Sequence, residues 1–211
     1  MAPPTKSSRP ELPREFVAGH KRRRMMDAIA ELTAEQGYEA TKIADIVRRA
    51  GVARKTLYDN FDGKEDLFLS AIDSSLKEMR MAVERACETA PGSWQDAVTA
   101  GIGALLSFVA ANPAASKMCM VEALCATPSS AARYDAAMRD YVDLLEGSVR
   151  GGDDLPETLE ESLVGGVSWI LQQQIRRDEA DRAGKLLSEL SQFVLSPYLG
   201  VGKVPDTGRR K

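Results

Sequence analysis

Residues 41–64 read TKIADIVRRAGVARKTLYDNFDGK, and this stretch decides the fold of the first part of the chain. Two short helical patterns flank Ala50, Gly51 and Val52. Alanine lets two helices cross closely, glycine takes a positive φ at no steric cost, and valine fills the space between the helices. Two short helices joined by such a turn form a helix-turn-helix, whose second helix can enter the major groove of DNA.

The second helix of this motif has an inner and an outer side. Leu57 and Phe61 are four residues apart and are predicted to face inward. The opposite side is rich in hydrogen-bonding and cationic groups, as expected for a surface that contacts DNA. It presents Arg54, Lys55, Thr56, Tyr58, Asp59 and Asn60.

Helical patterns continue on both sides of this motif. Upstream, apolar residues at positions 25, 28, 29 and 32 predict a helix that ends at Gly37. Thr41 is expected to cap the next helix. Asp62 with Glu65 is expected to form a capping box that opens a long helix. The run at 21–24 (KRRR) is interpreted as preceding the first helix, either contacting phosphates or simply facing solvent.

The rest of the chain also predicts helices, broken at Asn112-Pro113 and Thr127-Pro128 and stopped at Pro197. No segment alternates with period two, so the predicted fold class is all-α. It comprises an N-terminal three-helix helix-turn-helix head and a C-terminal helical body for ligand binding and dimerisation. The predicted divisions are a disordered arm (1–18), a DNA-binding domain (19–64), a ligand-binding and dimerisation domain (65–199) and a disordered tail (200–211).

Charge is distributed unevenly along the 211 residues. Residues 1–64 contain 13 Lys and Arg against 9 Asp and Glu, whereas residues 65–211 contain 15 against 22. A basic head on an acidic body favours approach of the head to phosphates, although chance asymmetry would give the same counts. Three cysteines without a zinc or redox spacing, and no apolar leader or membrane span, favour a reduced cytoplasmic location.

The helix-turn-helix stretch resembles the tetracycline-repressor (TetR) family over roughly residues 20–70. The family pattern matches without gaps, which makes the resemblance specific. The matching residues are Thr41, Ile43, Ala44, Ile46, Ala50, Gly51, Val52, Thr56, Leu57, Tyr58, Phe61, Lys64, Glu65 and Leu67. The resemblance implies a homodimer that binds two half-sites of a palindrome, with ligand binding in the body changing the spacing of the two heads.

The resemblance also implies which residues contact DNA. The family's contacts, carried over by position, are Thr41, Arg54, Lys55, Thr56, Tyr58, Asn60 and Lys64. Arginine can read guanine O6 and N7, and the other side chains can reach phosphates or base edges. Ala53 departs from the family, which commonly has a serine there as cap and phosphate ligand, so one contact is expected to be lost. Lys55 stands where the family often has glycine and can add one.

For the body, the resemblance implies a dimer through about residues 157–196 and a pocket for a small-molecule effector. Candidate pocket residues are Trp94, Phe108, Met118, Met120, Tyr134, Met138, Tyr141, Trp169 and Gln173. Large apolar residues at helical spacing normally pack in the core, and for each of these residues the core is the favoured interpretation. The sulfur atoms of the segment 118–120 (MCM) and of Cys125 invite a redox role, but buried core sulfur is the simpler interpretation.

The predicted function is a transcriptional regulator, of the repressor type, that binds a palindromic operator as a dimer and that a small-molecule effector releases. The alternative is a helical ligand-binding or interaction protein without sequence-specific DNA binding. No nucleophile elbow or phosphate-binding glycine loop is present, and His20 is the only histidine, so no enzyme, cofactor or metal site is predicted.

Overall fold

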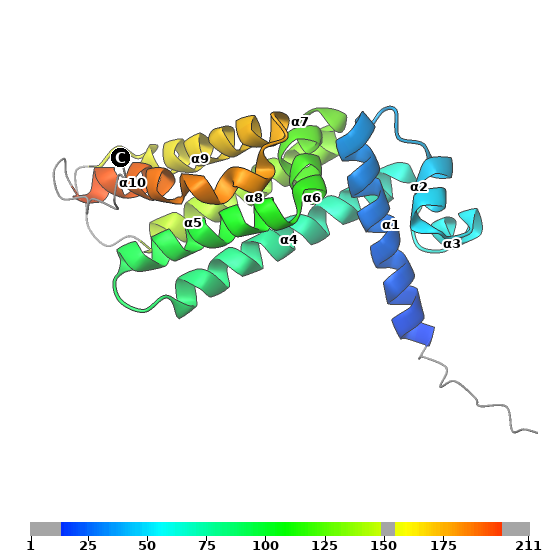
Figure 1. Ribbon diagram of the computed structural model, residues 1–211, viewed down its shortest axis with the longest axis horizontal. Helices are drawn as coiled ribbons and strands as arrows, with labels where there is room; N and C mark the ends of the chain where they lie inside the picture. Colours follow the sequence, from blue (N-terminus) through cyan, green and yellow to red (C-terminus); the bar gives the residue numbers. More distant parts are fainter. Residues whose placement is uncertain (1–13, 149–154, 200–211) are drawn as a thin grey trace, which may run out of the picture.

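The computed structural model describes residues 14–148 and 155–199, and within these ranges every regular element is a helix (Figure 1). The predicted all-α class is therefore confirmed. The elements are α1 (Arg14–Gln36), α2 (Ile43–Ala50), α3 (Arg54–Tyr58), α4 (Lys64–Thr89), α5 (Trp94–Ala111), α6 (Pro113–Lys117), the π-helix η1 (Met118–Glu122), α7 (Ala123–Ala126), α8 (Pro128–Ser148), α9 (Leu159–Arg176), the 3₁₀-helix η2 (Ala180–Leu186) and α10 (Leu187–Leu199).

Helices α1–α3 form a head at one end of the molecule (Figure 1). Gly51 adopts φ 61° and ψ 42° after α2, and its N–H bonds the carbonyls of Arg48 and Val47. This left-handed conformation is the one that glycine tolerates without strain. Ile46 and Leu57 are fully buried where α2 and α3 cross. The helix-turn-helix is thus built as its sequence predicts.

The body is a bundle in which α4 and α5 lie side by side and α8, α9 and α10 complete the walls (Figure 1). The N-terminus of α5 carries a capping box: the Ser93 hydroxyl accepts from the Asp96 N–H, and the Asp96 carboxylate accepts from the Ser93 N–H. By length and composition, α5 is the one described helix that is apolar enough to cross a membrane. It packs between α4 and α10, so the same composition suits a core helix.

Two expected helix starts are placed differently by the structure. Helix α2 begins at Ile43, so Lys42 is the capping position and the Thr41 hydroxyl instead donates to the Gly37 carbonyl at 2.8 Å. Helix α4 begins one residue later than the expected capping box requires. Its first turn is therefore closed by the Asp66 carboxylate, which accepts from the N–H of Asp62 at 3.0 Å.

The outer helices also extend further than predicted. Helix α1 begins at Arg14, so residues 14–18 are helical and the basic run at 21–24 lies inside the helix; residues 1–13 and 200–211 fall outside the described ranges. The first half of α1 is polar and lacks apolar periodicity, so the predicted start of this helix was too late. Helix α10 continues through Pro197 to Leu199. Tyr198, which follows Pro197, anchors the last turn of α10 because its hydroxyl donates a hydrogen bond to the Glu160 carboxylate at 2.7 Å.

Candidate DNA-binding surface and ligand cavity

The burial of Leu57 and Phe61 fixes which face of α3 is exposed to solvent. Leu57 and Phe61 are buried against α1 and α4, whereas Arg54, Lys55 and Tyr58 are exposed. The guanidinium of Arg54 lies 5.7 Å from the centre of the Tyr58 ring and donates to its hydroxyl at 3.4 Å. These three predicted contact residues therefore form one accessible cationic and aromatic surface.

Two other predicted contacts, Thr56 and Asn60, are half-buried at the end of α3. The Asn60 amide donates to the Thr56 carbonyl at 2.7 Å, and the Asn60 carbonyl accepts from Arg22 at 3.0 Å. Arg22 also lies 4.2 Å from the centre of the Phe61 ring. Asn60 thus ties α3 to α1, and the structure gives it a positioning role within the head.

The remaining two predicted contacts, Thr41 and Lys64, each have a partner within the head. Thr41 is 1% exposed. The Lys64 ammonium donates to the Tyr38 carbonyl at 3.0 Å and lies 3.9 Å from the centre of the Tyr38 ring. The side chain of Thr41 is therefore absent from the exposed surface, and Lys64 is already engaged in holding Tyr38.

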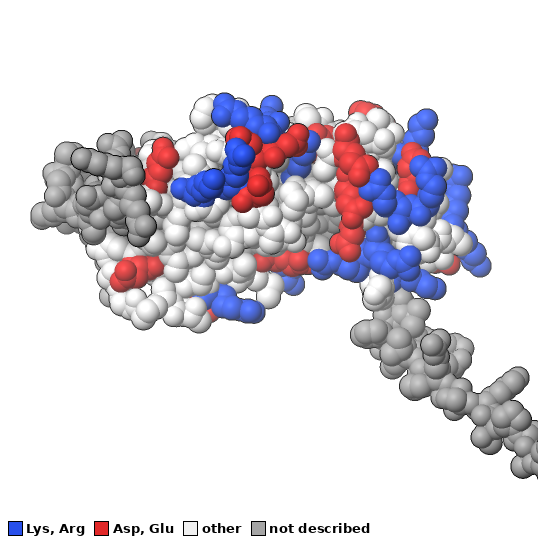
Figure 2. All heavy atoms as spheres, in the orientation of Figure 1, with Lys and Arg blue, Asp and Glu red and all other residues white. Residues whose placement is uncertain are grey.

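Basic side chains gather at the head end of the face seen in Figure 2. Several of them have intramolecular partners. Arg49 bonds Glu35 and Glu31, both at 2.8 Å, and these bonds raise the pKa of its guanidinium. Arg24, in the basic run, donates to the Gly51 carbonyl at 3.3 Å. Arg54 and Lys55 have no acidic partner among the described residues and remain available to a polyanion.

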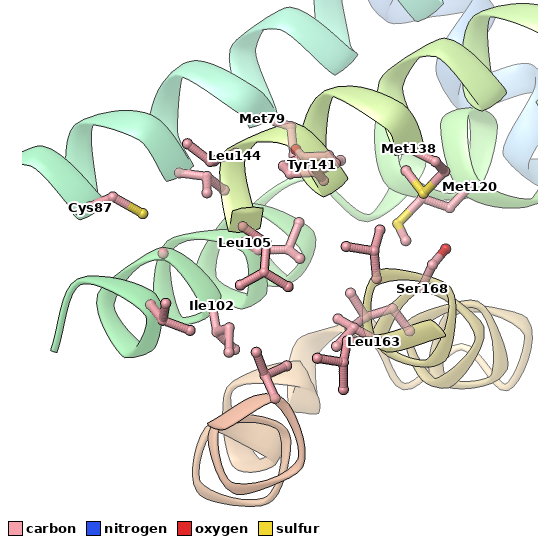
Figure 3. Close-up of a pocket in the computed structure, with 18 of the residues that line it drawn as sticks. Met79, Cys87, Ile102, Leu105, Met120, Met138, Tyr141, Leu144, Leu163 and Ser168 are labelled. Carbon is pink, nitrogen blue, oxygen red and sulfur yellow. The ribbon is translucent and has the colours of Figure 1, made fainter. Parts of the chain in front are cut away.

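The body contains a cavity of about 110 Å³ that is lined by α4, α5, η1, α8, α9 and α10 (Figure 3). Its walls are carbon and sulfur almost throughout, which suits an apolar ligand. The lining residues are Leu76, Met79, Val83, Cys87, Val98, Gly101, Ile102, Leu105, Met120, Tyr134, Met138, Tyr141, Leu144, Leu145, Leu163, Val164, Val167, Ser168, Leu171 and Val194.

Four of the nine predicted pocket residues line this cavity: Met120, Tyr134, Met138 and Tyr141. The other five do not, because each packs or points elsewhere. Met118 is fully buried in the core, Trp94 packs edge-on against Tyr198, and Trp169 is 62% exposed. The expectation is also corrected for Phe108, which lies at the α1–α4 side, and for Gln173.

One polar cluster interrupts the apolar wall. The hydroxyls of Tyr134 and Ser168 are hydrogen-bonded to each other, and the Gln172 amide donates to both, at 2.9 Å to Tyr134 and 3.2 Å to Ser168. Sequence reasoning selected Gln173 from the three consecutive glutamines, but the inward neighbour is Gln172. The signal was present, because Ser168 and Gln172 are four residues apart on one helix face.

The sulfur atoms do not form a common site. Cys119 is fully buried, and burial raises the pKa of its thiol to about 12, so it resists ionisation at neutral pH. Cys125 is exposed and Cys87 lines the cavity. Within residues 14–148 and 155–199, no three His, Cys, Asp or Glu side chains cluster to hold a metal ion.

The π-helix η1 connects this cavity to the head. Met120 lines the cavity, and two residues later the Glu122 carboxylate accepts from the Tyr38 N–H at 3.3 Å. The centre of the Tyr38 ring lies 4.4 Å from that of the Phe68 ring, and the Tyr38 carbonyl accepts a hydrogen bond from the Lys64 ammonium. A π-helical turn inside an α-helical segment often marks a functional site. A continuous set of contacts therefore joins the cavity wall to the start of α4.

An apolar surface remains on α9 and α10. Trp169 is 62% exposed and Phe193 is 42% exposed, which is unusual for side chains of this size. Gly166 lies below the Phe193 ring, where an added Cβ would come within 2.9 Å of Cζ. Glycine therefore lets the two helices approach closely at this face.

A family model described as "Bacterial regulatory proteins, tetR family" matches residues 25–71, which cover most of the head and the start of α4. An uncharacterised HTH-type transcriptional regulator of Bacillus subtilis, YezE, is 44% identical over 68 residues. That alignment covers 32% of this chain and 34% of YezE, so the chain matches about a third of this relative's length.

Two solved structures superpose on most of this chain, head and body together. The fatty acid degradation regulator FadR of Bacillus halodurans superposes with a TM-score of 0.74 at 18% identity, covering 82% of this chain and 97% of that one. FadR of Bacillus subtilis, solved in complex with stearoyl-CoA, gives 0.68 at 18% identity, covering 83% and 98%. At this identity the likeness establishes the fold of head and body together.

Proposed function

Because the chain belongs to the tetR family of bacterial regulatory proteins, we propose that it regulates transcription by binding a palindromic operator as a dimer, as a repressor that a small-molecule effector releases. The observation that carries this proposal is the exposed α3 surface of Arg54, Lys55 and Tyr58, which lies within the matched residues. Side chains of these types bond phosphates and base edges in the major groove. Regulation of transcription by a protein of this kind takes place in the cytoplasm.

The exposed face of α9 and α10 supports the dimer. Trp169 and Phe193 leave a large apolar area open to water, and such areas commonly mark protein–protein interfaces. Two copies related by a twofold axis would cover both side chains and set the separation of the two heads. Recognition helices about 34 Å apart would reach successive major grooves of one duplex face.

The dimer interface is tested by Trp169→Glu. A carboxylate at the centre of an apolar interface cannot be buried without a partner, so we expect a monomer at micromolar concentration and loss of operator binding. Sedimentation velocity measures the first effect and a gel-shift titration the second. Met81→Glu is the matched control, since Met81 is 46% exposed on α4. A Trp169→Glu protein that remains dimeric would contradict this interface.

The cavity and the π-helix support release by an effector. A ligand that displaces Met120 would shift η1 and with it Glu122, which holds the Tyr38 backbone. This segment would then have two arrangements, which differ in the position of the head relative to α4. An effector couples to DNA binding if it binds one of these arrangements more tightly than the other. The Bacillus subtilis FadR complex makes acyl-CoA thioesters the first effectors to try.

The coupling is tested by Glu122→Ala. Loss of the bond to the Tyr38 N–H should leave operator affinity within about threefold, since none of the described hydrogen bonds of Glu122 is to α3, but should reduce release by an effector about tenfold. The measurement is operator dissociation by octanoyl-CoA and stearoyl-CoA. Glu122→Gln keeps an acceptor oxygen and is expected to respond like the parent protein. Equal responses of the alanine variant and the parent would exclude this route.

The proposed function as a whole is tested by selecting random DNA duplexes with the purified protein and titrating the enriched sequence against salt. An inverted repeat whose affinity falls steeply with salt is the expected result, since each phosphate contact releases counterions. If no sequence is enriched with or without acyl-CoA present, the protein is instead a helical ligand-binding protein whose head does not read DNA.

A further inference from the structure

The cavity combines an apolar chamber with a single polar corner. Figure 3 shows Ser168 pointing toward the cavity beside Met120 and Met138, with Cys87 at the opposite end of the view. Ser168 and Tyr134 are each less than a tenth exposed. The hydroxyl groups of this corner therefore exchange hydrogen bonds with one another, with Gln172, or with a ligand in the cavity.

Counting hydrogens shows what the corner lacks. The two N–H bonds of Gln172 supply one donor to Tyr134 and one to Ser168. The contact between Tyr134 and Ser168 uses one of the two hydroxyl hydrogens. With the Gln172 amide in this orientation, the other hydroxyl hydrogen has no acceptor among the described residues. A buried donor without an acceptor costs free energy, and a ligand acceptor at this corner would remove that cost.

The charge around the cavity decides which acceptor fits. Its described lining contains no Lys, Arg or His. The nearest arginine in sequence, Arg133, is paired with Asp73 at 2.8 Å and does not line the chamber. A carboxylate buried here would lack a cationic partner, and burying an unpaired charge is far more costly than burying a neutral carbonyl.

We propose that the Tyr134–Ser168–Gln172 corner binds the carbonyl oxygen of a neutral acyl compound, such as an ester, thioester or ketone, and discriminates against the free carboxylate of the same chain length. The apolar chain of this ligand occupies the chamber that runs toward Cys87. This inference rests on the proposed function, because it names the effector class of the same cavity. It adds recognition of the carbonyl oxygen, which apolar walls alone cannot provide, since such walls exclude a carboxylate but distinguish an ester from a hydrocarbon only by size.

The test compares methyl octanoate, octanoate and octane at pH 7.5, where the acid is ionised. Binding is measured by calorimetry on the full-length protein. We expect methyl octanoate to bind at least about tenfold tighter than octanoate. In the double variant Tyr134→Phe with Ser168→Ala, ester affinity should fall about five- to tenfold, as for one lost hydrogen bond, while octane affinity stays unchanged.

Matched variants separate this corner from other hydroxyls. Ser162→Ala removes an exposed hydroxyl of α9 that donates to Thr158, and it should bind ester like the parent protein. Tyr141 also lines the cavity, and its buried hydroxyl has no partner among the described residues. If Tyr141→Phe lowers ester affinity and the double variant does not, the ester is recognised by the Tyr141 hydroxyl and the proposal for the Tyr134–Ser168–Gln172 corner is wrong.

Operator binding is measured on the same preparations, so the two hypotheses fail separately. Octanoate binding as tightly as the ester, no binding of any of the three probes, or unchanged ester affinity in a double variant of normal helicity would each overturn this inference, even with operator binding intact. Ester selectivity that depends on Tyr134 and Ser168 would support it, even in a protein that enriched no operator. The single variants Tyr134→Phe and Ser168→Ala provide the same comparison if the double variant does not fold.

Discussion

Replacing Arg54 and Lys55 together by alanine is expected to weaken operator binding by about 100-fold or more at physiological salt. Both side chains are exposed on α3 and lack an acidic partner among the described residues, so their charge is free for DNA. A bidentate base contact contributes about 1–3 kcal/mol, and every dimer would lose two copies of each side chain. The slope of log affinity against log salt should decrease by about 0.9 for each phosphate contact removed. Fluorescence anisotropy with the selected duplex measures both quantities.

The control for this double variant removes the same charge from the end of α9 instead of from α3. Arg176 and Arg177 are exposed at the end of α9, and their replacement by alanine should leave operator affinity within about threefold. Circular dichroism should show the same helicity for both double variants. Similar affinity losses in the two proteins would mean that overall charge, and not α3, governs binding.

Phe68→Ala is expected to lower the free energy of unfolding by about 3–5 kcal/mol, which is a large part of the stability of a typical domain. Phe68 is fully buried at the junction of head and body, and its ring lies 4.4 Å from that of Tyr38. Removing the ring leaves a cavity beneath the same tyrosine that holds Lys64 and Glu122. Urea denaturation at a fixed protein concentration gives the value, because any association between copies contributes to apparent stability.

The matched control on the same helix is Met81→Ala. Met81 is 46% exposed, so its replacement should change the free energy of unfolding by less than about 0.5 kcal/mol. A loss below about 1 kcal/mol for Phe68→Ala would show that the junction relaxes to fill the space. The head would then be joined to α4 less rigidly than its burial indicates.

The helix-turn-helix was predictable from sequence because its determinants are local. Gly51 adopts the left-handed conformation that the turn between α2 and α3 requires. Leu57 and Phe61 are four residues apart, and this helical spacing places both side chains on the inner side. The exposure of Arg54, Lys55 and Tyr58 follows from the same spacing. The family match over residues 25–71 rests on these short-range features.

The partners of polar side chains were not predictable in this way. Thr41 and Lys64 carry the right chemistry for phosphate contacts, but the structure directs them to Gly37 and Tyr38. A hydroxyl or an ammonium bonds whichever acceptor the fold brings near, and that acceptor belongs to a different turn or helix. Residue type alone therefore could not predict these two bonds, and the DNA contacts of both residues stay predictions.

The sequence by itself determined the helical class, the head and its cationic outer face, because helix period, turn glycine and side-chain charge act over a few residues. Only the tertiary structure decided the cavity. Trp169 and Met138 look alike as apolar helical residues, yet one is 62% exposed and the other lines the chamber. The physical reason is that a cavity wall is assembled from helices distant in sequence, whose rotation about their axes is fixed by packing against one another. The same packing brought Tyr134 of α8 to Ser168 and Gln172 of α9.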